Sequence, residues 1–360
     1  MQHNKTFFPL EDGFKQYGQD RNIMTFRQAR PTSVDTSSRT VSFMDTSNGV
    51  ESKEVETIPY YALIIATGTM TPTPTTSFHG DHKKTQEALE DINRRLAKAT
   101  SVVIAGGGPV AVETAGKVYK FPAYSAVHTK ISSGEIGEAL NGTKSSAESA
   151  RVKITVVAGG KKLLPVLGEK FSRKAANFLD KVGVKVVYNT KVTKVNFGAE
   201  HADKATVTLD NGETMTADVY IPATGAKPNT DFLPKRLLNE RGYVRTNPGT
   251  LRVDDAGARV YALGDVGSYT RGGILDLYAA TPVFGNNFGQ DLGLRQADKQ
   301  HKSDTSETQI VPVGSKVGVG AFKGFGMPSF VVKQAKGKDF MLGYIPKVTQ
   351  GESIHYSSCS

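Results

Sequence analysis

The most distinct pattern along the chain is an apolar run that passes directly into a helical pattern. Residues 101–105 have the sequence Ser-Val-Val-Ile-Ala and predict a short buried strand. Glycines and a proline follow, and small or apolar residues then recur at helical spacing from Ala111 to Val118. Strand, glycine-rich turn and helix in this order predict the first half of a dinucleotide-binding βαβ unit.

The turn has the glycine spacing that a bound pyrophosphate requires. Gly106 makes the tight turn, Gly108 lets the backbone approach the phosphates, and Ala111 allows close packing of helix and strand. Free N–H groups at the helix start then face the phosphates. A glycine-rich turn that binds nothing is the alternative. We predict a nucleotide site made of Gly106, Gly107, Gly108, Pro109, Val110 and Ala111.

A second pattern, a hairpin followed by a buried strand, occurs twice. In the first copy, alternating residues 40–43 and an Asn-Gly turn precede a run over 60–65 that continues into Ala-Thr-Gly. In the second copy, alternating residues 205–209 and an Asn-Gly turn precede a run over 217–221 that also continues into Ala-Thr-Gly. Small residues at a strand's carboxyl end let backbone approach a ligand. We therefore predict ligand contacts at Thr67, Gly68, Thr224 and Gly225.

A further strand, over 260–263, ends in Gly264-Asp265 and is followed by a helical pattern over 274–294. An aspartate at that position can accept hydrogen bonds from a ligand's hydroxyl groups, and the helix start can face a phosphate or a ring carbonyl. Together with the duplicated strands, this predicts two similar nucleotide-binding domains.

The second strand of the βαβ unit is expected at 152–157, later than usual, and residues 121–150 account for the excess as a surface loop or as an intron read through. No carboxylate follows this strand. A carboxylate there would bind the ribose 2′-hydroxyl of NAD, so its absence leaves space for a 2′-phosphate that Lys161 or Lys162 could pair with. We favour the simpler interpretation of two loop lysines in water, and the choice between NADPH and NADH stays open.

Composition excludes several classes of protein. No apolar run approaches the roughly 18 residues that span a bilayer, and no signal or transit pattern is visible, so we expect a cytoplasmic protein with peripheral membrane contact at most. The lone Cys359 excludes a disulfide framework and a dithiol reductase. The net charge of +10 indicates a solvated basic surface, and we expect no nucleic-acid partner. No metal-ligand cluster, nucleophile elbow or carboxylate pair is found.

Taken together, the segment GGGPVAVETAG (106–116), the two Ala-Thr-Gly strands and YALGDV (261–266) resemble the flavoproteins with two dinucleotide-binding domains, the pyridine nucleotide-disulfide oxidoreductase superfamily. Within it, the likeness is greatest to apoptosis-inducing-factor-like (AMID-type) oxidoreductases and type II NADH:quinone dehydrogenases. It covers about residues 25–345, with 121–150 unmatched.

The resemblance implies that Gly264 and Asp265 hold the ribityl and phosphate part of FAD, with Thr67-Gly68 near the crossover of the flavin domain. The glycine loop at Gly106 would bind NAD(P)H. Glu113 matches a family position close to the nicotinamide pocket, although a helix-face glutamate in water is the alternative.

The C-terminal segment would border the flavin and the quinone or membrane surface. The apolar candidates for that surface are Phe322, Phe325, Met327, Phe330 and Phe340, but we favour ordinary core packing for these residues.

The family's first glycine loop, which binds the FAD pyrophosphate, has no counterpart here. By the spacing of the second copy it would lie before Met1, and we favour a truncated N-terminus over a degenerate protein. The predicted fold is α/β, with two Rossmann-like three-layer domains and a small α+β C-terminal region. We expect an incomplete, discontinuous FAD domain at 1–75 and 235–310, an inserted NAD(P) domain at 76–234, and a C-terminal region at 311–360.

The predicted function is that of an FAD-dependent NAD(P)H oxidoreductase, which passes hydride from nicotinamide to flavin and then electrons to a quinone-like or other small acceptor. A tailoring oxidoreductase of secondary metabolism is the alternative among enzymes. A degenerate nucleotide-binding interaction protein without redox activity is the alternative from another class.

Overall fold

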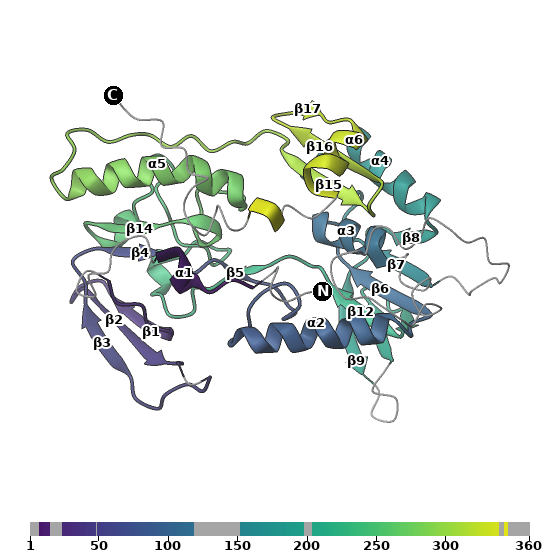
Figure 1. Ribbon diagram of the computed structural model, residues 1–360, viewed down its shortest axis with the longest axis horizontal. Helices are drawn as coiled ribbons and strands as arrows, with labels where there is room; N and C mark the ends of the chain where they lie inside the picture. Colours follow the sequence, from purple (N-terminus) through teal and green to yellow (C-terminus); the bar gives the residue numbers. More distant parts are fainter. Residues whose placement is uncertain are drawn as a thin grey trace. The chain divides into compact units, whose positions relative to one another are not determined.

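The computed structural model describes residues 7–14, 24–47, 49–118, 152–197, 204–337 and 342–344. These residues form two compact units (Figure 1). Unit 1 contains residues 71–225 and 306–345, and unit 2 contains residues 9–70 and 226–305. Several positions discussed above, namely Asn48, the 121–150 segment, Phe340 and Cys359, lie outside the described residues.

Unit 1 is built on a four-stranded parallel sheet in the order β12-β6-β7-β8. The predicted glycine strand forms as β6 at the same residues, Ser101–Ala105, and all of it except Ser101 is buried. The strand predicted at 152–157 forms as β7, Lys153–Val157, beside β6. The outer strands are β8 (Val184–Val187) and β12 (Val219–Pro222). Strands buried on both faces are typical of parallel sheets, which explains their continuous apolar runs.

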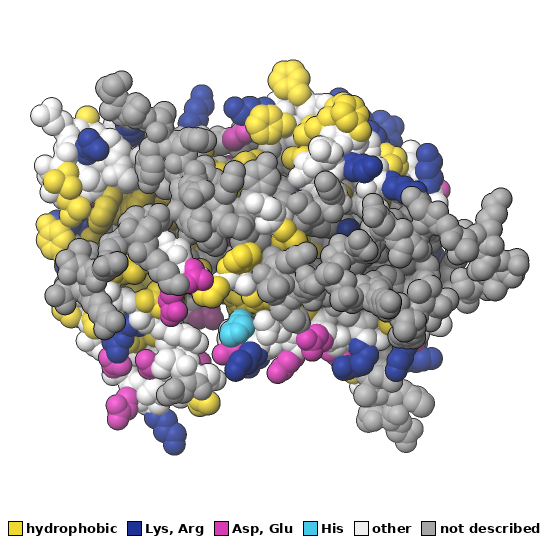
Figure 2. All heavy atoms as spheres, viewed as in Figure 1, with side chains coloured by type: hydrophobic (Ala, Val, Ile, Leu, Met, Phe, Trp, Pro, Cys, Tyr) yellow, Lys and Arg dark blue, Asp and Glu magenta, His cyan; other side chains and the backbone are white. Residues whose placement is uncertain are grey.

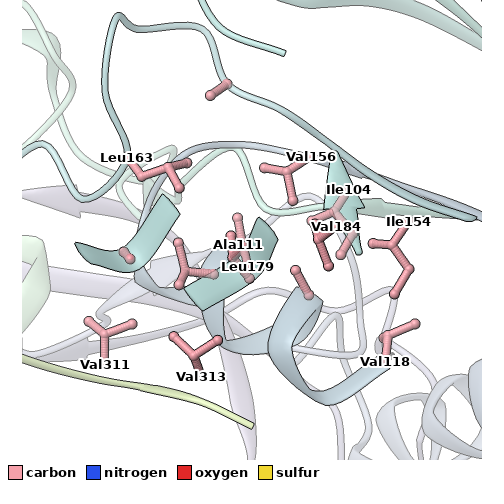
Figure 3. Packing of buried hydrophobic residues seen from close by; sticks show 14 of the residues in the cluster. Ile104, Ala111, Val118, Ile154, Val156, Leu163, Leu179, Val184, Val311 and Val313 are labelled. Carbon is pink, nitrogen blue, oxygen red and sulfur yellow. The ribbon is translucent and has the colours of Figure 1, made fainter. Parts of the chain in front are cut away.

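Helices and further strands cover both faces of this sheet. One face packs against α3 (Pro109–Val118) and α4 (Glu169–Lys181), which also contact β15 (Gln309–Val313). Figure 3 shows Val311 and Val313 approaching the same apolar cluster as Ala111 and Leu179. On the other face, Val103 and Val157 pack against an antiparallel sheet with the strands β9 (Val192–Phe197), β10 (Ala205–Leu209) and β11 (Thr214–Ala217).

Two further parts complete unit 1. Helix α2, His82–Leu96, begins where the side chain of Asp81 accepts a hydrogen bond from the backbone N–H of Lys83, as an N-cap does. After β15, the chain forms β16 (Val317–Phe322), β17 (Phe325–Gly326), α6 (Ser329–Val332) and a single π-helical turn, Lys333–Gly337.

Unit 2 repeats the strand pattern of the predicted second copy. Strands β1 (Ala29–Asp35), β2 (Thr40–Asp45) and β3 (Glu56–Pro59) form an antiparallel sheet, as β9, β10 and β11 do in unit 1. The chain then continues into β4, Leu63–Ile65, as it does into β12. The duplication seen in the sequence is therefore present in the structure.

The two copies differ in the partners of that last strand. In unit 1, β12 pairs with the glycine strand β6. Among the described residues of unit 2, β4 pairs with β14, Val260–Ala262, and with no other strand. Unit 2 also contains β5 (Thr69–Met70) paired with β13 (Lys227–Pro228), and the long helix α5, Ile274–Asp291.

Candidate functional site

The glycine loop of unit 1 has the backbone geometry that the sequence predicts. Gly106 has a φ of +132°, and a Cβ atom built on it would lie 2.1 Å from the carbonyl oxygen of Ala223. Its backbone N–H donates to the carbonyl oxygen of Val157 across 2.8 Å. The positive φ and the short distance from a Cβ to the Ala223 carbonyl oxygen both require glycine at this position. The contact with Ala223 also places the loop at the carboxyl end of β12, next to Thr224 and Gly225.

The next two glycines differ in what surrounds them. A Cβ on Gly107 would lie 3.2 Å from the Cβ of Ala158, so this glycine keeps the loop close to the end of β7. Among the residues that the structure describes, a Cβ on Gly108 would meet no atom within 4 Å. Open space over Gly108, at the start of α3, is what a phosphate group needs in order to reach backbone N–H groups. The residues of the loop therefore fit a bound dinucleotide.

Helix α3 anchors this loop by its buried face. Pro109 is its first residue, where a proline's missing N–H costs nothing. Ala111, Val112 and Ala115 are completely buried, while Val110 is 46% exposed at the open end of the loop. The small side chain of Ala111 lets the helix approach the sheet, as predicted from its spacing.

The second Ala-Thr-Gly motif lies at the same edge of the sheet. The backbone N–H of Ala223 donates to the carbonyl oxygen of Ala105 across 2.7 Å. Thr224 and Gly225 are exposed, and Gly225 has a φ of +100°, with no atom of the described residues within 4 Å of a Cβ position. The glycine loop and the second Ala-Thr-Gly motif thus lie at the same edge of the sheet, although they come from distant parts of the sequence.

Glu113 lies on α3, one helical turn after Pro109. Its carboxylate is 14% exposed and forms an ion pair with the ammonium group of Lys336 at 2.7 Å. Burial raises the pKa of Glu113 above its ordinary value, and the charge and hydrogen bond of Lys336 offset part of that shift. A glutamate in water, one of our two sequence interpretations, is therefore wrong. Nothing in the local sequence indicates Lys336, which lies 223 positions away.

The two lysines after β7 have different surroundings. Lys162 is partly buried, and its ammonium group donates to the carbonyl oxygen of Leu167 across 2.5 Å. Lys161 is exposed. The chain returns to the carboxyl end of β7 at Lys191, whose Cγ lies 3.1 Å from where a Cβ on Gly159 would be. Sequence reasoning missed Lys191 because it lies beyond the next strand.

In unit 2, the first Ala-Thr-Gly motif forms two hydrogen bonds with Asn229. The hydroxyl group of Thr67 donates to the carbonyl oxygen of Asn229, and the Asn229 amide donates to the carbonyl oxygen of Thr67, both across 2.8 Å. Gly68 has a φ of +62° and open space at its Cβ position. The motif is thus a fixed turn with accessible backbone.

The Gly-Asp motif of unit 2 is held at the start of α5. Gly264 has a φ of +72°, and its backbone N–H donates to the hydroxyl oxygen of Tyr269 across 2.9 Å. The carboxylate of Asp265 accepts a hydrogen bond from the backbone N–H of Gly273, the residue before α5, across 2.8 Å. Asp265 has a second carboxylate oxygen that can accept from a ligand hydroxyl. This end of the unit therefore fits the ribityl and phosphate part of FAD.

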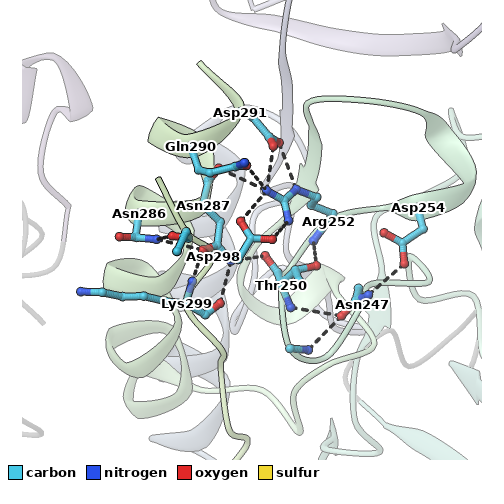
Figure 4. Close-up of polar contacts among 12 residues, drawn as sticks. Asn247, Thr250, Arg252, Asp254, Asn286, Asn287, Gln290, Asp291, Asp298 and Lys299 are labelled. Atoms are coloured by element: carbon cyan, nitrogen blue, oxygen red, sulfur yellow. Dashed lines mark hydrogen bonds and ion pairs between the residues drawn. The ribbon is translucent and has the colours of Figure 1, made fainter. Parts of the chain in front are cut away.

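A charged cluster that sequence reasoning missed fixes α5 against β14 (Figure 4). Arg252 donates to Asp291 at 2.7 and 3.0 Å and to Asp298 at 2.6 and 2.8 Å. The hydroxyl group of Tyr261, on β14, donates to Asp291 across 2.6 Å. Burial alone would raise the pKa of Asp291, but the hydrogen bonds from Arg252 and Tyr261 hold it below its usual value. The cluster therefore fixes the C-terminal end of α5, of which Asp291 is the last residue.

The aromatic residues of the C-terminal segment are mostly on the surface. The exposed fractions of Phe322, Phe325 and Phe330 are 48%, 80% and 72%. In Figure 2, hydrophobic side chains lie beside Lys and Arg side chains in the region of β16, β17 and α6. Core packing, the interpretation that we favoured for these residues, is wrong for these three, while Met327 is partly buried. The core positions of β16 are taken instead by Val319 and Ala321.

Two features are absent from the described residues. No helix in that part of the chain is long and apolar enough to cross a membrane. No group of three or more His, Cys, Asp or Glu side chains among the same residues could hold a metal ion.

Comparison with known proteins agrees with this geometry. The family model of the pyridine nucleotide-disulphide oxidoreductases matches residues 4–282. The chain belongs to this family. The family's members depend on FAD and NAD(P)H, so the resemblance, the α/β fold with nucleotide-binding domains and the cofactors expected from the sequence are confirmed.

Individual relatives within the family are oxidoreductases of several kinds. Oxidoreductase phnG of Penicillium herquei is 38% identical over 95% of this chain and 80% of its own length. A FAD-dependent oxidoreductase of Flammulina velutipes is 28% identical over 94% of this chain and 93% of its own. Proteins named apoptosis-inducing factor are also among the relatives.

Solved structures of the family share the fold. A NAD-dependent persulfide reductase from A. fulgidus matches with a TM-score of 0.55 and 22% identity, over 86% of this chain and 51% of its own. The chain thus spans about half the length of that protein, and this likeness concerns the fold alone.

Proposed function

We propose that this oxidoreductase binds NAD(P)H on the glycine loop of unit 1 and FAD on unit 2, and passes electrons from the nicotinamide through the flavin to a small acceptor. The observation that carries the proposal is the loop itself. Gly106 must be glycine to pass Ala223, and Gly108 opens onto free space at the start of a helix. A pyrophosphate is the ligand that such a loop is built to receive.

The chain's own residues supply orientation and charge in this proposal. The loop from Gly106 to Ala111 holds the pyrophosphate of the nicotinamide dinucleotide, and Thr224-Gly225 border the same space. FAD supplies the chemistry, because a flavin accepts hydride from nicotinamide and returns electrons to an acceptor. Thr67-Gly68 and Gly264-Asp265 hold the flavin cofactor, with Asp265 accepting from a hydroxyl group. Glu113, which the ion pair with Lys336 keeps in place, would lie beside the nicotinamide.

A quinone-like molecule is the acceptor class that we propose. A second candidate is the oxidation or reduction of a secondary metabolite. This candidate is compatible with the relative from Penicillium herquei, which is 38% identical and is named only as an oxidoreductase. For either reaction we propose a cytoplasmic protein, since the 360 residues contain a single cysteine, as is common in reducing compartments.

The test is anaerobic spectroscopy of the purified protein with FAD added and excess FAD removed. We expect a flavin absorbance band that NADH or NADPH bleaches and that a soluble benzoquinone restores. Protein that retains no FAD, or retained FAD that neither nucleotide bleaches, would contradict the proposal. Bleaching without recovery on addition of benzoquinone would contradict the quinone-like acceptor and favour the second candidate.

A further inference from the structure

The carboxyl end of β7 borders the glycine loop and carries no acidic side chain. β7 lies between β6 and β8 in the parallel sheet. Beyond Val157 the chain continues as Ala-Gly-Gly-Lys-Lys, and Gly107 lies against Ala158. In dinucleotide-binding folds, an acid at this place binds the adenosine ribose 2′-hydroxyl, and it would repel a phosphate there. The ribose end of the proposed site therefore has no group that excludes a 2′-phosphate.

A second chain segment is fixed over the same place. The backbone N–H of Thr190 donates to the carbonyl oxygen of Ala158 across 3.2 Å, and that of Asn189 donates to the carbonyl oxygen of Gly160 across 3.1 Å. Lys191 follows directly, with its Cγ only 3.1 Å from where a Cβ on Gly159 would lie. A side chain on residue 159 would meet this aliphatic stem, so glycine there makes room for Lys191.

The ammonium groups around this place are not equivalent. Lys162 donates to the carbonyl oxygen of Leu167, which turns its charge toward its own loop. Lys161 and Lys191 are both exposed, and neither forms an ion pair within the part of the chain that the structure describes. The acidic residue joined to this segment is Asp210, whose backbone N–H donates to the carbonyl oxygen of Lys191 across 2.9 Å.

From these contacts we propose that Lys161 and Lys191 together bind a 2′-phosphate, and that the dinucleotide site prefers NADPH to NADH. The proposal rests on the proposed function, because it needs the dinucleotide on the glycine loop. Two ammonium groups from separate loops suit a phosphate dianion, which accepts several charge-assisted hydrogen bonds at once. Lys191 is the new member of this pair. It takes the place of Lys162, whose ammonium group donates to the carbonyl oxygen of Leu167.

The test uses two nucleotides that differ only in the phosphate of interest, adenosine 2′,5′-bisphosphate and 5′-AMP. Their binding to the purified protein is measured by isothermal titration calorimetry at low salt. We expect the bisphosphate to bind at least about tenfold more tightly, as two partly exposed charge pairs would give. Raising the salt concentration should reduce that ratio, because exposed charges are screened.

Three variants assign the effect to the lysines. Lys161→Gln and Lys191→Gln should each lower the ratio about threefold, and the double variant should bind both nucleotides equally. Lys153→Gln is the matched control. It removes the same charge from an exposed position at the opposite end of β7 and should leave the ratio unchanged.

The outcomes separate the two proposals. If neither nucleotide binds, the dinucleotide site itself is refuted, and the preference for NADPH is refuted with it. If both bind with equal affinity, or if the double variant keeps the wild-type ratio, the dinucleotide site stands and the 2′-phosphate site is refuted. Because the readout is binding of nucleotide fragments, it does not depend on the flavin or on turnover.

Discussion

Replacement of Lys336 by methionine should destabilise unit 1 in a manner that depends on pH. The substitution keeps a long apolar side chain but removes the ammonium group that lies 2.7 Å from the Glu113 carboxylate. In the wild-type protein the Glu113 side chain is 14% exposed and the Lys336 side chain is 28% exposed, so the lost interaction is neither fully buried nor freely solvated. The substitution leaves a largely buried carboxylate without its partner.

The magnitude follows from that intermediate burial. Breaking a fully buried pair costs about 3–5 kcal/mol, and losing a hydrogen bond to a charged group costs about 1.5–3 kcal/mol. We therefore expect Lys336→Met to lower the free energy of unfolding by about 2 kcal/mol near neutral pH. For a unit of this size, that corresponds to a melting temperature about 4–8 °C lower.

The direction of the pH dependence is set by the pKa of Glu113. Burial raises this pKa above its ordinary value, and Lys336 lowers it part of the way back, so removing Lys336 raises it further. A carboxyl group whose pKa is raised by folding costs stability at pH values above that pKa, because the folded state binds the proton more tightly than the unfolded state does. As the pH falls through the raised pKa, the group becomes neutral and the cost disappears.

The assay is thermal unfolding of four proteins, each at about pH 8 and at about pH 5. They are the wild type, Lys336→Met, Glu113→Gln and the double variant. Lys336→Met should lose more stability at the higher pH. The double variant should return to within about 1 kcal/mol of the wild type, because no buried charge remains. Equal stability of Lys336→Met and the wild type at both pH values would refute the reasoning.

Three further predictions concern other parts of the molecule. Arg252→Met should destabilise unit 2 by about 3 kcal/mol near neutral pH, because Asp291 loses its partner. Since the pKa values of Asp291 and Asp298 are lowered by Arg252, this difference should vanish as acid titrates both groups, and a constant difference down to about pH 2 would contradict it. Gly106→Ala should lower the stability of unit 1 by about 3 kcal/mol or more, because its Cβ would lie 2.1 Å from a carbonyl oxygen, and an unchanged melting temperature would be inconsistent with that geometry. Phe325→Ser should change the free energy of unfolding by less than about 0.5 kcal/mol in urea denaturation, since this ring is 80% exposed, and a large loss would mean that the ring is buried in solution.

Local patterns predicted the elements of the site well, because their causes are local. The glycine strand formed at the predicted residues, since a buried parallel strand must be apolar along its whole length. Gly106 was predicted as a tight turn from spacing alone, and its φ of +132° agrees. The duplicated Ala-Thr-Gly strands were predicted in the same way, and each follows a three-stranded antiparallel sheet.

Contacts between distant parts of the sequence could not be predicted in this manner. Lys336 reaches Glu113 only because the C-terminal strands pack on α3, and no period or motif encodes that docking. Lys191 reaches Gly159 because β8 returns the chain beside β7. The positions of Phe322, Phe325 and Phe330 were predicted wrongly for a related reason. Apolar type alone suggested core packing, whereas valines and alanine on β16 fill the core and leave Phe322 exposed at the strand's end.

The central claim is that nicotinamide nucleotide binds on the glycine loop and reduces the flavin. The most direct measurement compares anaerobic flavin reduction by NADPH in the wild-type protein and in Gly108→Asp. Within the described part of the chain no atom lies within 4 Å of a Cβ at this position, so the fold should survive, but the aspartate carboxylate would occupy and repel the phosphate position. We predict rapid bleaching in the wild type and a loss of at least about a hundredfold in rate in a variant with unchanged melting temperature. Equal rates of bleaching in the two proteins would contradict the account.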